Sequence, residues 1–159
     1  MELVSYFQAV ADSSLSQAIS TSTWAFAVIE SVHLLALAVI GGAVLVVDLR
    51  LLGWGLRDQR VADLARDAFP WLVGSLIVML VTGYLLMASL AYSKYFINYA
   101  FQLKMWFLFA AILYTYTIRR SFTRRDESRI NPAVAKIIAI VSILLWSGVG
   151  IMGRGIGFY

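Results

Sequence analysis

The stretch WAFAVIESVHLLALAVIGGAVLVV, residues 24–47, is almost entirely apolar. A helix needs about 20 mostly apolar residues to cross the hydrocarbon core of a bilayer, so this stretch predicts a transmembrane span. Three more segments of the same kind follow, at about residues 70–92, 99–118 and 132–152. The sequence therefore predicts an all-α integral membrane four-helix bundle, folded as a single transmembrane domain over residues 1–159.

Local signals mark the expected helix starts. The run Ser20-Thr21-Ser22-Thr23 offers capping hydroxyls before the first span, and Asn131-Pro132 offers a cap and first turn for the fourth. Pro70 is expected in the first turn of the second span. Residues 1–19 alternate apolar and polar side chains at helical spacing, which predicts an N-terminal amphipathic interfacial helix that packs across the bundle end.

The composition excludes several classes of function. Hydrophobic residues make up 61% of the chain and charged residues only 14%, against about 25% charged in soluble domains. The chain has no cysteine and one histidine, which excludes disulfides, thiolate sites and any site needing two histidines from one chain. Phosphate-binding loops, nucleophile elbows and metalloprotease motifs are absent from the sequence, so it assigns no enzymatic activity.

The basic residues predict the orientation in the membrane. Ten of the thirteen Lys and Arg residues lie in or beside the loops after the first and third spans: Arg50, Arg57, Arg60, Arg66, Arg119, Arg120, Arg124, Arg125, Arg129 and Lys136. By the positive-inside rule both loops are cytoplasmic, which places both termini in the periplasm of a bacterial inner-membrane protein. Since this rule accounts for the basic loops, we expect no nucleic-acid partner.

Ionisable residues within the spans predict a site in the outer half of the bilayer. From the expected outer end of each helix, Glu30, His33 and Lys104 lie roughly 9, 13 and 8 Å deep, and Arg154 lies at the same end of the fourth span. Such residues are rare in membranes and usually functional. The candidate set also includes nearby residues of the same half: Tyr84, Trp146 and Met152.

The expected chemistry is metal or haem binding. Glu30 and His33 are three residues apart and are predicted to share one helix face, as metal ligands in helical bundles do. A neutral imidazole is also a common haem ligand, with Lys104 and Arg154 suited to bind propionates. The cofactor is expected to be haem b or copper, with His33 and Glu30 as ligands.

Short motifs connect the chain to known families. His33-Leu34-Leu35-Ala36-Leu37 followed by Gly41-Gly42 resembles the first-helix pattern of CopD-type copper-resistance membrane proteins. Glu30-x-x-His33, Asp48-Leu49-Arg50-Leu51-Leu52-Gly53, Lys104 and Gly153-Arg154 more closely resemble a family of small, uncharacterised four-helix bacterial membrane proteins. The chain has half the helices of CopD proteins and a single histidine. The resemblance implies an inner-membrane protein of copper or haem biology.

Other readings of the same residues stay open at this stage. Glu30, His33 and Asp48 could line a proton or metal-cation path, although the segment between His33 and Asp48 is apolar. The chain could instead be an accessory subunit of a membrane complex, with the charged residues forming structural pairs. We expect redox or electron-transfer activity with a membrane or periplasmic partner, and a homo-oligomer that packs through its small-residue helix faces.

Overall fold

The computed structural model describes residues 8–10, 12–56, 58–89, 98–125 and 131–156. Its four long helical segments are α3 (Ala25–Leu52), α4 (Val61–Ser89), a composite of α6 (Tyr99–Tyr114), η1 (Thr115–Arg119) and α7 (Arg120–Thr123), and α8 (Pro132–Gly155). Each segment is long and apolar enough to cross a membrane. The predicted all-α membrane bundle is confirmed, and the chain is a multi-pass membrane protein whose apolar helix surfaces contact lipid.

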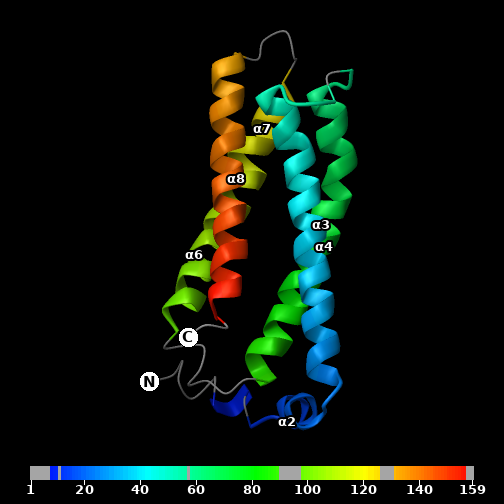
Figure 1. The fold of residues 1–159 in the computed structure, drawn as a ribbon, viewed down its shortest axis with the longest axis vertical. Coiled ribbons are helices and arrows are strands. Elements are labelled where there is room, and N and C mark those ends of the chain that lie inside the picture. The colour runs from blue at the N-terminus through cyan, green and yellow to red at the C-terminus, as the bar shows by residue number, and fades with distance from the viewer. Residues whose placement is uncertain (1–7, 11, 57, 90–97, 126–130, 157–159) are drawn as a thin grey trace.

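The four segments run side by side along the long axis of the molecule (Figure 1). Helix α3 packs against both α4 and α8, and α6 packs against α8. Helix α7 reaches α4 at the end where α4 and α8 begin, which we call the Arg-rich end. The other end, where α2 lies, is called the α2 end.

Several helix boundaries follow the sequence signals. The Ser22 hydroxyl accepts a hydrogen bond from the Ala25 backbone N–H at 3.2 Å, and Asn131 caps α8 through Ala133 at 2.9 Å. Helix α3 continues beyond the predicted residue 47 to Leu52. It ends at Gly53, whose φ of 80° lets the Trp54 N–H donate back to the Leu49 carbonyl at 2.9 Å.

Helix α4 begins at Val61, so Pro70 lies inside it and not in its first turn as predicted. The earlier start has a physical cause, since Val61, Leu64 and Ala65 pack on the core at the Arg-rich end. That burial outweighs the single backbone hydrogen bond that a proline removes. The predicted last residues of this span, 90–92, lie outside the described residues.

The N-terminal segment differs from one continuous helix over residues 1–19. Within the described residues the chain turns at Asp12, and α2 (Ser14–Thr21) starts afresh with Ser13 as its cap. Helix α2 crosses the end of the bundle (Figure 1). The buried Ser16 hydroxyl donates to the Ala88 carbonyl of α4 at 2.5 Å, which confirms the packing role. Residues 1–7 and 11 of the predicted helix lie outside the described residues.

The glycines differ in what they do. A Cβ atom at Gly148 would lie 2.6 Å from Cδ1 of Phe107, so the close approach of α6 and α8 requires glycine there. A Cβ at Gly41 or Gly42 would meet nothing within 4 Å. The Gly41-Gly42 face is therefore left open within the chain, where we predicted contact with a second copy.

Candidate functional site

His33 is buried, with 8% of its surface exposed, and its Nδ1 lies 2.8 Å from Oγ1 of Thr82 on α4. The Thr82 hydroxyl has one proton, which it donates to the Val78 carbonyl at 2.7 Å. With Thr82 donating to Val78, Thr82 accepts from His33, and in this arrangement the imidazole proton is assigned to Nδ1. This assignment leaves the lone pair of the ring on Nε2.

Gly83 makes room for the same imidazole. A Cβ at this position would lie 3.2 Å from Cε1 of His33 and 3.8 Å from Nδ1. Thr82 and Gly83 of α4 therefore both restrict the orientation of the ring. Sequence reasoning did not connect either of them with His33, because nothing in one chain's pattern says which residue of α4 faces a given residue of α3.

Lys104 completes a cluster from three helices. It is half-buried on α6 and interacts electrostatically with His33. Its Nζ lies against α8, 3.4 Å from where a Cβ of Gly153 would be. We call His33, Thr82 and Lys104 the His33 layer, and it brings together two of the predicted site residues.

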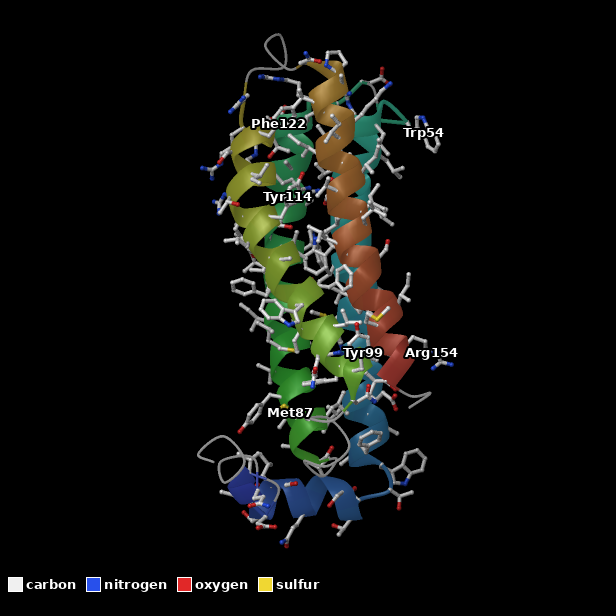
Figure 2. The ribbon with its side chains drawn as sticks, turned by 90° about the vertical axis from the view of Figure 1, so that its left-hand side faces the viewer. Trp54, Met87, Tyr99, Tyr114, Phe122 and Arg154 are labelled. Carbon is white, nitrogen blue, oxygen red and sulfur yellow. The ribbon has the colours of Figure 1, made fainter. Side chains whose placement is uncertain are left out.

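Glu30 and Arg154 lie apart from this buried cluster. Glu30 is exposed although His33 is buried, so the structure does not place both side chains on the inward face as predicted. Three residues turn a helix by about 300°, which separates their directions by about 60° and leaves Glu30 at the helix edge. Arg154 is exposed, and Figure 2 shows its side chain directed away from the bundle at the end of α8.

The three remaining candidates also differ in burial. Tyr84 is 44% exposed and Met152 is half-buried. Trp146 is buried, but its Nε1–H donates to Oγ1 of Thr115 at 3.2 Å. Helix side chains lean toward the helix N-terminus, which for α8 is the Arg-rich end, so the indole is turned toward that end.

The described part of the chain has no group of three or more His, Cys, Asp or Glu side chains that could hold a metal ion. Copper sites draw their ligands from several side chains. A haem iron receives four nitrogen ligands from its own macrocycle and needs only axial ligands from protein.

A second polar cluster, which the sequence analysis did not predict, lies near the Arg-rich end. Arg119 Nε donates to Oδ1 of Asp48 at 2.8 Å, and Nη2 donates to the Val44 carbonyl at 3.0 Å. Asp48 is completely buried and Arg119 is 6% exposed. The Ser142 hydroxyl of α8 lies close to the carboxylate without closing a hydrogen bond. We call Asp48, Arg119 and Ser142 the Asp48 layer.

A π-helical turn, η1, places Arg119 in this cluster. The sequence analysis assigned Arg119 to a cytoplasmic loop, but the third span continues to Thr123 as helix. The wider turn at Thr115–Arg119 changes the helical phase, and both end residues of the turn are buried. Single π-turns inside α-helices are often found at functional sites.

An apolar plug separates the two layers. Its residues are almost completely buried side chains from α3, α6 and α8: Ala36, Ile40, Ala111 and Val149. Along α3, His33 and Asp48 are 15 residues apart, or roughly 22 Å at 1.5 Å per residue. The two clusters are therefore separate sites and not one continuous polar path.

Residues 7–159 match a family described as a family of unknown function, DUF6644. The chain belongs to DUF6644. Searches of the curated proteins and of the solved structures found no match. Membership of DUF6644 agrees with the predicted likeness to an uncharacterised family, and it assigns no ligand to the His33 layer of this DUF6644 chain.

Proposed function

We propose that this chain is a membrane-embedded haem-binding redox protein, with His33 as an axial ligand of haem iron. The observation that carries the proposal is the Thr82 hydrogen bond to Nδ1, which leaves the Nε2 lone pair of a buried histidine available. Histidines that bind metals usually donate their other ring N–H in this way, which fixes the tautomer and the ring direction.

Lys104 supports the haem form of the proposal. Its ammonium group interacts with His33 from α6, at the same depth in the bundle. A half-buried cation beside a ligand histidine suits an anionic group such as a haem propionate through a charge-assisted hydrogen bond. Copper stays the alternative cofactor, with Glu30 as a second ligand in the prediction, but exposure of Glu30 weighs against it.

One chain supplies one histidine, so a six-coordinate iron needs a second axial ligand. A second copy of the chain would provide one, and the open Gly41-Gly42 face allows close helix approach. The proposal therefore includes a homo-oligomer. Electrons would pass to or from a membrane or periplasmic partner. The CopD-type resemblance is consistent with this assignment and stays a prediction.

Transport is the second candidate, and the apolar plug weighs against it. A proton or cation path along α3 would have to cross Ile40 and Val149, which are completely buried among apolar neighbours. A redox centre at the His33 layer needs no such path.

The proposal also places the His33 layer in the periplasmic half of a bacterial inner membrane. It rests on the positive-inside rule, because α7 and the start of α4 carry the arginines at one end of the bundle. A reporter active only in the periplasm, fused after Tyr159, is expected to be active. A silent periplasmic reporter with an active cytoplasmic one would reverse the orientation.

The function is tested by the visible spectrum and metal content of the full chain, purified in mild detergent after expression with haem supplied. Wild type is expected to show a Soret band and stoichiometric iron, and His33→Ala to lose both at equal folded yield. Thr82→Val is expected to weaken haem binding by about 10- to 100-fold, the usual effect of removing a residue that orients a ligand.

Ser75→Ala is the matched control for Thr82→Val. Ser75 lies on the same helix, is equally buried at 8%, and donates to its own helix backbone at the Trp71 carbonyl. Ser75→Ala is expected to bind haem like wild type. Equal loss in both variants would point to a general packing effect, and a wild-type chain without haem or metal would refute the proposal.

A further inference from the structure

A cavity lies between α3, α4 and the π-helical turn, beside the Asp48 layer. The volume in which the centre of a water molecule fits is about 30 Å³. The cavity walls combine apolar side chains, among them Phe69, with two arginines and two threonines: Arg119, Arg120, Thr115 and Thr123. Three of the four polar lining residues, Thr115, Arg119 and Thr123, are more than nine-tenths buried.

Arg119 presents donors that the described residues leave without an acceptor. Its hydrogen bonds to Asp48 and Val44 use Nε and Nη2. Its Nη1 group makes no hydrogen bond to any residue in the described ranges, and the side chain lines the cavity. Because the Arg119 side chain lines the cavity, an acceptor bound there would lie within reach of this N–H group.

Thr115 presents a second donor. Its Oγ1 accepts from the Trp146 indole at 3.2 Å, and its own proton has no acceptor among the described residues. A helical threonine normally donates to the carbonyl four residues earlier, as Thr117 does to Leu113 at 2.6 Å. The described residues show no such bond from the Thr115 hydroxyl, although the Thr115 backbone N–H donates to the Ala111 carbonyl as in a regular α-helix.

The charge around the cavity is positive. Asp48 balances Arg119, but Arg120 adds a further charge, with its guanidinium carbon 4.3 Å from the centre of the Phe69 ring. No carboxylate lines the cavity. A water molecule needs about 10–15 Å³ measured in this way, so the space suits about two waters, or one monatomic anion with a water. A macrocycle or a phosphate ester is too large.

We propose that this cavity binds a small inorganic monovalent anion of the chloride type, held by Nη1 of Arg119 and the hydroxyl of Thr115. Arg120 contributes long-range attraction. The bound anion would satisfy both buried donors and link α3, α4 and the third span at the Arg-rich end. The proposal is independent of the haem site, because the apolar plug separates the two layers.

The first test is thermal unfolding of the full chain in detergent, with sodium bromide or chloride replacing sodium gluconate at constant ionic strength. Gluconate is too large to enter the cavity. A halide that binds only the folded state raises Tm along a saturable curve. Thr115→Val is expected to shift the halide midpoint at least tenfold upward, while Thr115→Ser keeps it near the wild-type value.

Thr117→Val is the matched control. Thr117 belongs to the same π-turn but is exposed and does not line the cavity. Its halide midpoint is expected to be unchanged. Equal shifts in Thr115→Val and Thr117→Val would contradict the site.

A spectroscopic test uses Trp146, which contacts Thr115 directly. The other four tryptophans, Trp24, Trp54, Trp71 and Trp106, are at least 68% exposed and are replaced together by phenylalanine. Bromide is expected to quench Trp146 fluorescence, and the quenching is expected to saturate with bromide concentration. Its midpoint is expected to equal the midpoint of the Tm curve. Linear or absent quenching, together with equal Tm in bromide and gluconate, would show that the cavity holds water only and overturn the proposal.

Discussion

The two polar layers of this bundle differ in how many of their hydrogen-bonding groups have partners. In the His33 layer the described contacts leave a lone pair, on Nε2 of a buried imidazole. In the Asp48 layer, Oδ2 of Asp48 and the Ser142 hydroxyl have no partner among the described residues, and the neighbouring cavity is lined by Arg119 and Thr115. A lone pair suits a metal centre, and a cavity lined by arginines suits an anion, so we propose different ligands for the two regions.

The two layers also differ in the number of polar contacts that the chain itself supplies. The Asp48 layer contains a buried ion pair with one further hydrogen bond to the backbone, although Oδ2 of Asp48 has no partner among the described residues. The His33 layer has one side-chain hydrogen bond between helices and a half-buried lysine. We therefore propose that the Asp48 layer stabilises the bundle and that the His33 layer binds a ligand.

The largest expected effect comes from breaking the Asp48 layer. Arg119→Met leaves the completely buried Asp48 carboxylate unpaired, which costs about 3–5 kcal/mol of unfolding free energy. Arg66→Met removes an exposed pair with Asp63 at 3.3 Å and is expected to cost about 0–1 kcal/mol. Denaturant titration in detergent measures both. Similar losses of unfolding free energy in the two variants would show that the Asp48 layer has no special structural role.

A smaller loss of unfolding free energy is expected at the contact between α6 and α8. Gly148→Ala forces a methyl group against the Phe107 ring, at a cost of about 1–3 kcal/mol. Gly41→Ala meets no neighbour within the chain and is expected to keep the stability of the monomer. If Gly148→Ala is as stable as Gly41→Ala, the two helices do not approach as closely as described.

The smallest effect on stability is expected at the His33 layer. Gly83→Ala brings a methyl group to 3.2 Å from the imidazole, which asks for a shift of a few tenths of an ångström and costs below about 1 kcal/mol. The same shift moves Nε2, so the visible spectrum of the haem-loaded protein is expected to change. Gly74→Ala serves as the control, because a Cβ at Gly74 meets no atom within 4 Å. Identical spectra in the two variants would show that Gly83 does not affect the ligand site.

Composition alone predicted the four spans, because a run of about 20 mostly apolar residues is typical of a transmembrane helix. The boundaries that failed are those where packing overrides a local signal. Pro70 normally marks a helix start, yet the apolar residues from Val61 onward extend α4 backward to the core. The extension of α3 to Leu52 is of the same kind.

The candidate site was predicted in part for a related reason. His33 and Lys104 were found because charged or titratable groups within a span are rare. Thr82 could not be assigned as the partner of His33 from spacing, since the contact joins two helices. Arg119 was placed in a loop because a regular helical period does not reveal a π-turn, and the turn brings it to Asp48.

The central claim is that His33 is an iron ligand, and imidazole rescue tests it most directly. His33→Gly removes the ligand and leaves a space for free imidazole at a buried position. The account predicts that the variant loses the Soret band of the wild type and regains it when imidazole is added to the apoprotein with haem. A variant that keeps the wild-type spectrum without imidazole, or a wild-type chain that takes up no haem, would contradict the claim.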